Sequence, residues 1–206
     1  MKLKAGFVTH AAAKYAVKAW HYSKKLPVGK KVIIGFFEDD TFIGVVIFSQ
    51  GANNNLLKPY GLSQIEGCEL SRVALSQHKT PVTKVIKIAI ALLKKKCPGL
   101  RLIVSFADSN QGHVGTIYQA GNWIFTGMTG CDYEYHYKGR AYHKRQVSVS
   151  GFNKQFGALK RSPKVEDCKK IRLGPKLRYL MPLDKKMRKQ ILSIAKLYIK
   201  SVPDKH

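Results

Sequence analysis

Acidic side chains are scarce in this sequence: 12 Asp and Glu stand against 37 Lys and Arg, and the net charge at pH 7 is +25. Solubility alone does not require so large an excess of one sign. A chain with few groups that repel phosphates and many that attract them is suited to a polyanionic partner. The composition therefore predicts binding to nucleic acid.

The acidic residues are fewest in the C-terminal third. Residues 138–206 hold 20 Lys and Arg but only 4 Asp and Glu, whereas residues 1–137 hold 17 Lys and Arg and 8 Asp and Glu. A chain of 206 residues can bury one sizeable core. We therefore expect one main domain over residues 1–150 and a basic C-terminal extension, residues 151–206, packed on the same domain.

Paired cysteines and long apolar runs are missing as well. The four cysteines form no Cys-x-x-Cys pair, which argues against a disulfide framework or a zinc knuckle and predicts reduced thiols. No stretch approaches the roughly 20 apolar residues of a membrane span. The N-terminus also lacks the apolar segment of a secretion signal. These absences predict a cytoplasmic protein.

Residues 185–200 are the only candidate for an amphipathic helix in the basic third. The apolar face of this helix consists of Ile191, Leu192, Ile194, Ala195 and Leu197. Such a face either packs on the protein core or binds a membrane surface. Packing on the core is the preferred interpretation, so no membrane partner is predicted.

Hydrophobic periodicity predicts alternating strands and helices without an internal repeat. Expected strands cover residues 3–10, 31–39, 41–51, 68–75, 100–108, 122–130 and 145–152, the last two flanking a polar, aromatic segment at 131–145. Expected helices cover 11–21, 81–96 and 112–121, the second with Thr80 as N-cap and Pro81 at its first position. Strand 100–108 is too apolar for a sheet edge and is expected to be central. The alternation of helices and strands along the chain indicates an α/β fold.

Residues 69–123 resemble the central half of a GNAT acetyltransferase. The strand ELSRVAL, an amphipathic helix and a buried strand are followed by a short helix that carries GTIYQAGNW. This last run stands in the place of the superfamily's Ala-x-x-x-Tyr-x-x-x-Gly-Phe motif. The resemblance implies a mixed central sheet flanked by helices, with the basic extension added to it.

The glycines of a coenzyme A site are absent. In GNAT enzymes the loop after the fourth strand reads Arg/Gln-x-x-Gly-x-Gly/Ala, and its amides hold the pyrophosphate. This chain reads QHKTPVTK at residues 77–84, with no glycine that would let the backbone close on a pyrophosphate. The resemblance implies acetyl-CoA, but this loop argues against its ordinary mode of binding.

Longer strings carry a more specific resemblance. WHYSK, FIGVVIFSQGAN, CELSRVAL, PGLRLIVSFAD, QGHVGTIYQAGNWIFTG and YHYKGRAYHKR together are similar to the Mom family of phage DNA-modification proteins, a divergent GNAT-like branch, over about residues 20–145. The resemblance implies that adenine in double-stranded DNA is converted to N6-carbamoylmethyladenine, which protects phage DNA from host restriction. It also implies acetyl-CoA and iron as cofactors, with His21 and Asp108 as metal ligands.

Asp108 and Tyr118 are the first candidates for catalysis. Asp108 ends the expected central strand, at the sheet edge where open α/β folds bind ligands, and its carboxylate is able to accept a proton from the adenine amine. The alternative is that Asp108 or Asn110 only caps the next helix. Tyr118 lies on that helix, where GNAT enzymes use a tyrosine as general acid. A tyrosine packed on the sheet is the alternative.

The HYS run near the N-terminus is the second candidate. The family resemblance assigns His21 as general base or metal ligand, and Tyr22 offers a ring on which a flipped base can stack. Ser23 is then a substrate-binding residue, as are Arg72 and, with less support, Ser105. Glu69 and Arg72 point to opposite faces of a regular strand, and Arg72 is expected to face the site. His113, His136 and His143 show no i, i+4 pair, so a metal helix is not indicated.

Basic residues are expected to hold the DNA phosphates. The predicted contacts are Lys24, Lys25, Arg140, Lys144, Arg145, Arg161 and Lys176. In the C-terminal third such residues alternate with possible stacking partners, namely Tyr142, Phe152, Phe156 and Tyr179. A conventional acetyltransferase and a non-catalytic DNA-binding protein stay open as alternatives, and so does the oligomeric state, including a homodimer.

Overall fold

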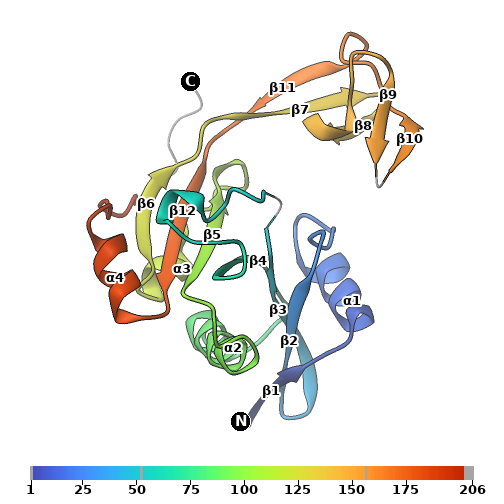
Figure 1. Cartoon of the computed structure of the whole chain (residues 1–206). Helices are drawn as coiled ribbons and strands as arrows, with labels where there is room; N and C mark the ends of the chain where they lie inside the picture. The colour runs from blue at the N-terminus through green and yellow to red at the C-terminus, as the bar shows by residue number, and fades with distance from the viewer. Residues whose placement is uncertain (1, 52, 156, 202–206) are drawn as a thin grey trace.

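A seven-stranded mixed sheet forms the body of the computed structural model, which describes residues 2–51, 53–155 and 157–201 (Figure 1). In spatial order the strands are β1 (Leu3–Phe7), β2 (Lys31–Glu38), β3 (Thr41–Ser49), β4 (Gly67–Leu75), β5 (Leu102–Asp108), β12 (Lys176–Pro182) and β6 (Ile124–Met128). Strands β4 and β5 pair in parallel, and the other neighbours are antiparallel. The predicted α/β class and the central place of β5 are confirmed.

Helices cover both faces of this sheet, because its central strands are apolar on both sides. Helix α1 (His10–Trp20) packs against β2 and β3 on one face, and α4 (Lys185–Leu192) packs farther along that face against β5 and β12. Helices α2 (Val82–Lys96) and α3 (Thr116–Ala120) cover the other face. Each large apolar side chain buried in these layers contributes about 1.5–3 kcal/mol of transfer free energy.

Strands β4 and β5 separate toward their carboxyl ends. They pair only from Gly67 to Glu69 on β4 and from Leu102 to Val104 on β5. Beyond this point β4 stays with β3 and β5 stays with β12. The divergence leaves space between two parallel strand ends, where ligands bind in open α/β sheets.

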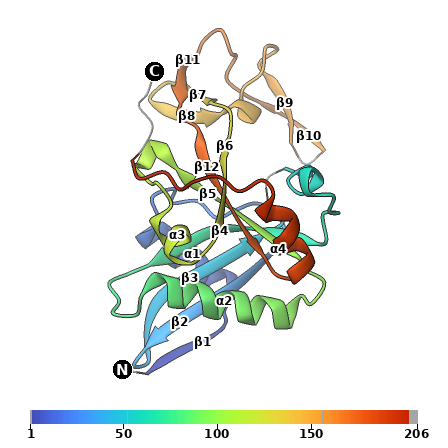
Figure 2. The ribbon, with the colours of Figure 1, turned by 90° about the vertical axis from the view of Figure 1, so that its left-hand side faces the viewer.

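A second group of strands, which we call the β-arm (residues 129–175), projects from the body at the end away from the N-terminus (Figures 1 and 2). It contains β7 (Asp132–Tyr137), β8 (Arg140–His143) and β11 (Lys169–Leu173) in one sheet, and a hairpin of β9 (Phe152–Gln155) and β10 (Ala158–Arg161). The expected strand at 145–152 is wrong, and segment 131–145 is a hairpin. Lys138 and Gly139 both have positive φ, which is the geometry of a two-residue hairpin turn.

The C-terminal segment returns from the arm to the body. Strand β12 lies inside the central sheet between β5 and β6, so the expected boundary at residue 150 falls within the β-arm and the extension completes the main domain. The expected helix at 185–200 is only partly correct. Met187 and Ile191 are fully buried, but helix α4 ends at Leu192 and Leu197 is 93% exposed.

After a turn at Ser193 and Ile194, the chain runs beside the edge strand β6. The Lys196 amide donates to the Phe125 carbonyl (2.8 Å), and the Tyr198 hydroxyl donates to the Trp123 carbonyl (2.7 Å). These bonds replace the expected final turns of helix. Across the described ranges, no helix has both the length and the apolar content needed to cross a membrane. All four cysteines are free thiols.

Candidate functional site

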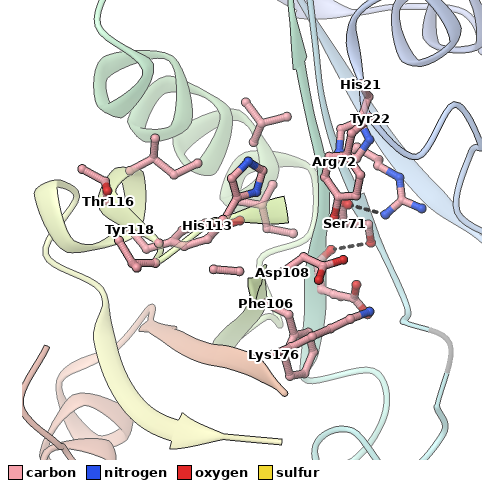
Figure 3. Close-up of a pocket in the computed structure, with 18 of the residues that line it drawn as sticks. His21, Tyr22, Ser71, Arg72, Phe106, Asp108, His113, Thr116, Tyr118 and Lys176 are labelled. Atoms are coloured by element: carbon pink, nitrogen blue, oxygen red, sulfur yellow. Dashed lines mark hydrogen bonds between the residues drawn. The ribbon is translucent and has the colours of Figure 1, made fainter. Parts of the chain in front are cut away.

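A pocket of about 540 Å³ lies where β4 and β5 diverge (Figure 3). Its wall brings together residues from α1, β4, β5 and α3 that are far apart in the sequence. The predicted site residues on this wall are His21, Tyr22, Arg72, Asp108 and Tyr118. Lys176, predicted only as a DNA contact, lines the pocket too, since it is paired with Asp108 across β12 and β5.

His21 follows the last turn of α1 and is 8% exposed. Its Nδ1 accepts a hydrogen bond from the Ser23 amide at 3.1 Å. Burial, and then the charges of Arg72, His113 and Lys24, lowers the pKa of His21 from its usual 6.5 to about 4. The imidazole is therefore neutral at pH 7, and with Nδ1 accepting, its hydrogen lies on Nε2.

Tyr22 forms an exposed aromatic surface at the pocket. Its ring stacks on His21 with centroids 4.4 Å apart, and meets the edge of His113 at 5.7 Å. The side chain is 47% exposed. Burial raises the pKa of Tyr22, as does the nearby Asp108 carboxylate, while Arg72 opposes the shift.

Tyr118 closes the floor of the pocket and belongs to the core at the same time. Its hydroxyl lies 2.8 Å from Ser105 Oγ, which in turn donates to the Leu70 carbonyl at 2.9 Å. Burial raises the pKa of Tyr118 to about 12, so the phenol stays protonated. It is suited to donate a proton or a hydrogen bond rather than to act as a base.

Two predicted substrate-binding residues are behind the pocket wall. Ser105 is fully buried and bonds Tyr118, and Ser23 bonds His21; neither side chain lines the pocket. Their contacts orient Tyr118 and His21.

Asp108 caps the turn after β5 and also lines the pocket, so its catalytic role stays a prediction. Its Oδ1 accepts from the Asn110 amide at 3.1 Å and from Asn110 Nδ2 at 3.0 Å, which caps the short 3-10 turn after β5. The residue also lines the pocket. A carboxylate has two oxygens, so capping through Oδ1 is compatible with a role of Oδ2 in the pocket.

The expectation for β4 is corrected by a β-bulge. Ile47 on β3 faces Arg72, but the next residue, Phe48, faces Leu70, so Ser71 is an extra residue in β4. The bulge breaks the alternation of side chains, and both Glu69 and Arg72 line the pocket. Arg72 Nε donates to the Lys25 carbonyl at 3.1 Å, which ties the segment after α1 to β4.

Most predicted DNA contacts lie at the surface. Lys24 and Lys25 follow α1, and the exposed predicted residues of the β-arm are Arg140, Lys144, Arg145 and Arg161. Tyr142 is partly buried and Phe152 is 45% exposed. Tyr179 is fully buried under α3 and β6, so the prediction that it stacks on DNA is wrong. Phe156 lies outside the described residues.

A second pocket of about 440 Å³ adjoins the first at the base of the β-arm. Glu69, Phe106 and Lys176 line both pockets. The remaining wall comes largely from β7 and the ends of β8 and β11, where Lys144 pairs with Asp132 at 2.9 Å. The candidate site thus borders a second pocket at the base of the β-arm.

The sequence favoured Arg72 over Glu69 for the site and gave only a weak signal for His113 as a metal ligand, yet Glu69 and His113 both line the pocket. His113 lies in the loop between β5 and α3, a position typical of site residues, but a single histidine in a loop carries little signal. No group of three or more His, Cys, Asp or Glu side chains suitable for a metal occurs among the residues described. The proposed iron ligands His21 and Asp108 stay a prediction.

A sequence model of the Mom protein family matches residues 2–200, nearly the whole chain. This chain belongs to the Mom protein family. Among curated proteins it is similar to methylcarbamoylase mom of Escherichia phage Mu, with 24% identity over 183 residues, which cover 87% of this chain and 75% of the relative. The family prediction from the sequence strings is confirmed.

Solved structures confirm the GNAT fold of this Mom-family protein. An acetyltransferase of Bacillus subtilis in complex with CoA matches with a TM-score of 0.50 and 13% identity, covering 89% of this chain and all of the other. The acetyltransferase yncA of Salmonella typhimurium with acetyl-CoA matches with a TM-score of 0.50 and 12% identity, covering 90% of this chain and 96% of the other. At such low identity the likeness shows the fold alone.

The loop that would hold a coenzyme A pyrophosphate does not fit this group in the Mom-family protein. Helix α2 begins at Val82 with Pro81, not Thr80, at the N-cap. The amides of Lys79 and Thr80 donate to the Glu38 carboxylate instead of facing an open site. No reaction step is therefore assigned to acetyl-CoA.

Proposed function

We propose that this Mom-family protein is a DNA-modifying transferase that converts adenine to N6-carbamoylmethyladenine in double-stranded DNA and so protects the DNA from restriction. One observation carries the proposal: a single pocket combines the Asp108 carboxylate, a hydrogen-bond acceptor, with neutral His21, whose hydrogen is on Nε2. The name of the phage Mu relative, methylcarbamoylase, supports the same chemistry.

The adenine edge complements this pair of groups. The N6 amine donates hydrogen bonds and the adjacent ring nitrogen accepts one. Asp108 accepts from the amine, and the Nε2–H of His21 donates to the ring nitrogen. Tyr22, held against His21, provides an aromatic surface for the base once it leaves the DNA stack.

The proposed reaction forms a bond between N6 and an alkyl carbon. Simple acetyl transfer would give an amide on nitrogen, so the donor carries a carbamoylmethyl group on a leaving group. The N6 lone pair attacks the methylene carbon, the leaving group departs with its bonding electrons, and Asp108 takes the N6 proton. Tyr118, protonated at neutral pH, supplies a proton to the leaving group.

Duplex DNA is proposed to lie against the β-arm and the segment after α1. In the β9–β10 hairpin, Phe152 is paired with Arg161 and Lys154 with Leu159. Side chains of directly paired residues lie on the same face of a sheet, so two basic and two apolar side chains share one face. Phosphate contacts combined with apolar contacts to bases are typical of proteins that distort DNA.

Mass spectrometry of nucleosides tests the proposed function. DNA from cells that express the protein is expected to contain deoxyadenosine enlarged by C2H3NO, and plasmid from these cells to resist some restriction enzymes. DNA from cells that express the Asp108→Asn variant serves as the control. Acetylated lysine or small amines, with unmodified DNA, would instead establish a conventional acetyltransferase.

Two substitutions at His21 separate its possible roles. His21→Gln retains an N–H donor near the position of Nε2, whereas His21→Asn retains an acceptor near Nδ1 for the Ser23 amide. If His21 donates to adenine, the Gln variant is expected to keep roughly tenfold more activity than the Asn variant, the equivalent of about 1.4 kcal/mol for one hydrogen bond. Equal loss in both variants, measured by nucleoside analysis, would favour His21 as a base or metal ligand.

A further inference from the structure

Glu38, at the end of β2, makes an unusual contact with the loop between β4 and α2. Its two carboxylate oxygens accept from the Lys79 amide at 3.0 and 3.2 Å, and Oε1 also accepts from the Thr80 amide at 2.7 Å. The nearby Thr80 side chain and the hydrogen bonds from the Lys79 and Thr80 amides lower the pKa of Glu38 to about 2. The carboxylate is therefore charged at every physiological pH.

The bonded amides occupy the position that attracts anions in this fold. They immediately precede helix α2, whose fifteen residues align their peptide dipoles toward this end. Glu38 supplies an anion there from 41 residues away. Pro81, which has no N–H, removes one more donor from the helix start.

The active pocket does not reach this loop. Its wall includes β4 up to Val73 and α3 from Thr116 to Tyr118, but no residue from 76 to 82. A coenzyme A molecule spanning both places would need the loop amides that Glu38 holds, and its diphosphate would meet the carboxylate. Like charges at hydrogen-bond distance repel strongly at a site that is only partly exposed to solvent.

We infer that Glu38 is a specificity-determining residue that closes the pyrophosphate site of the GNAT fold, so that the group donor is not held by a diphosphate at helix α2. The donor is selected in the pocket itself, by its small transferable part. This inference rests on the β2–α2 contact and not on the adenine chemistry, so each can fail without the other.

Binding of 3′-phosphoadenosine 5′-diphosphate, the nucleotide half of coenzyme A, tests the closure. In calorimetric titrations at about 0.15 M salt, where surface charges are partly screened, Glu38→Ala is expected to bind this probe at least tenfold more tightly than the parent protein. Asp40→Ala is the matched control. It removes one carboxylate from the same β2–β3 turn, where Asp40 is exposed and forms an ion pair with Lys4.

Asp40→Ala is expected to bind the probe like the parent. An equal gain in affinity for the probe in both variants would mean that only the net charge of the protein affects binding, and would overturn the inference. The inference would also be overturned if the parent protein bound the probe tightly and Glu38→Ala did not increase the affinity.

A second measurement needs no substitution and so does not depend on the folding of a variant. In ¹H–¹⁵N spectra of the parent protein titrated with coenzyme A, the amide signals of Lys79 and Thr80 are expected to stay in place. Large shifts of these two signals at saturation would show that the diphosphate displaces Glu38, and the inference would be wrong.

Discussion

Asp108→Asn is expected to lower adenine modification by roughly 10²-fold or more, the scale of a lost general base. The substitution keeps an oxygen at the position of Oδ1, which caps Asn110, but removes the negative charge that accepts the N6 proton. The folded state and DNA binding should therefore be retained. Nucleoside mass spectrometry gives the rate, and a thermal melt confirms that the variant is folded.

Tyr118→Phe is the companion to this experiment. It removes only the hydroxyl, and Ser105 keeps its bond to the Leu70 carbonyl, so no buried donor is left unpaired. Adenine modification by Tyr118→Phe is expected to fall about as much as that by Asp108→Asn. Near-parental modification by folded Asp108→Asn would mean that Asp108 is only the cap of the 3-10 turn, and near-parental Tyr118→Phe would restrict Tyr118 to packing.

Duplex DNA binding is expected to weaken by roughly 10³-fold when salt is raised from about 50 to 200 mM, as for a protein that neutralises about six phosphates. The basic residues after α1 and on the β-arm are the proposed contacts. A Kd that does not change with salt would contradict their role.

A pair of double variants locates these contacts. Arg140→Ala with Arg161→Ala removes two exposed charges of the β-arm, and the slope of log Kd against log salt should fall by roughly 1.8. Lys87→Ala with Lys95→Ala removes the same charge from exposed positions of α2, on the body. For this control variant, the slope of log Kd against log salt should equal that of the parent. An equal change of slope in the two double variants would place the DNA interface elsewhere.

Local patterns in the chain were enough for the body of the fold. The strands and helices up to β6 follow hydrophobic periodicities of two and 3.6 residues, which depend only on neighbours in the sequence. Asp108 was found for the same reason, because the end of a central strand is a local feature, whereas Tyr118 was singled out by the resemblance to GNAT enzymes. The excess of Lys and Arg and the HYS run also needed no structure.

Contacts between distant segments decided the rest. Strand β12 pairs with β5 across about 70 residues, and a mostly apolar strand of seven residues carries no local signal of which strand it pairs with. The bulge at Ser71 comes from the register of β4 on β3, and it interrupts the regular alternation that the sequence predicted for Glu69 and Arg72. The contact of Glu38 with the loop before α2 likewise joins segments that are far apart in the sequence. Residue types and periodicity were readable in the chain, but register and side-chain direction arise only when distant strands pair.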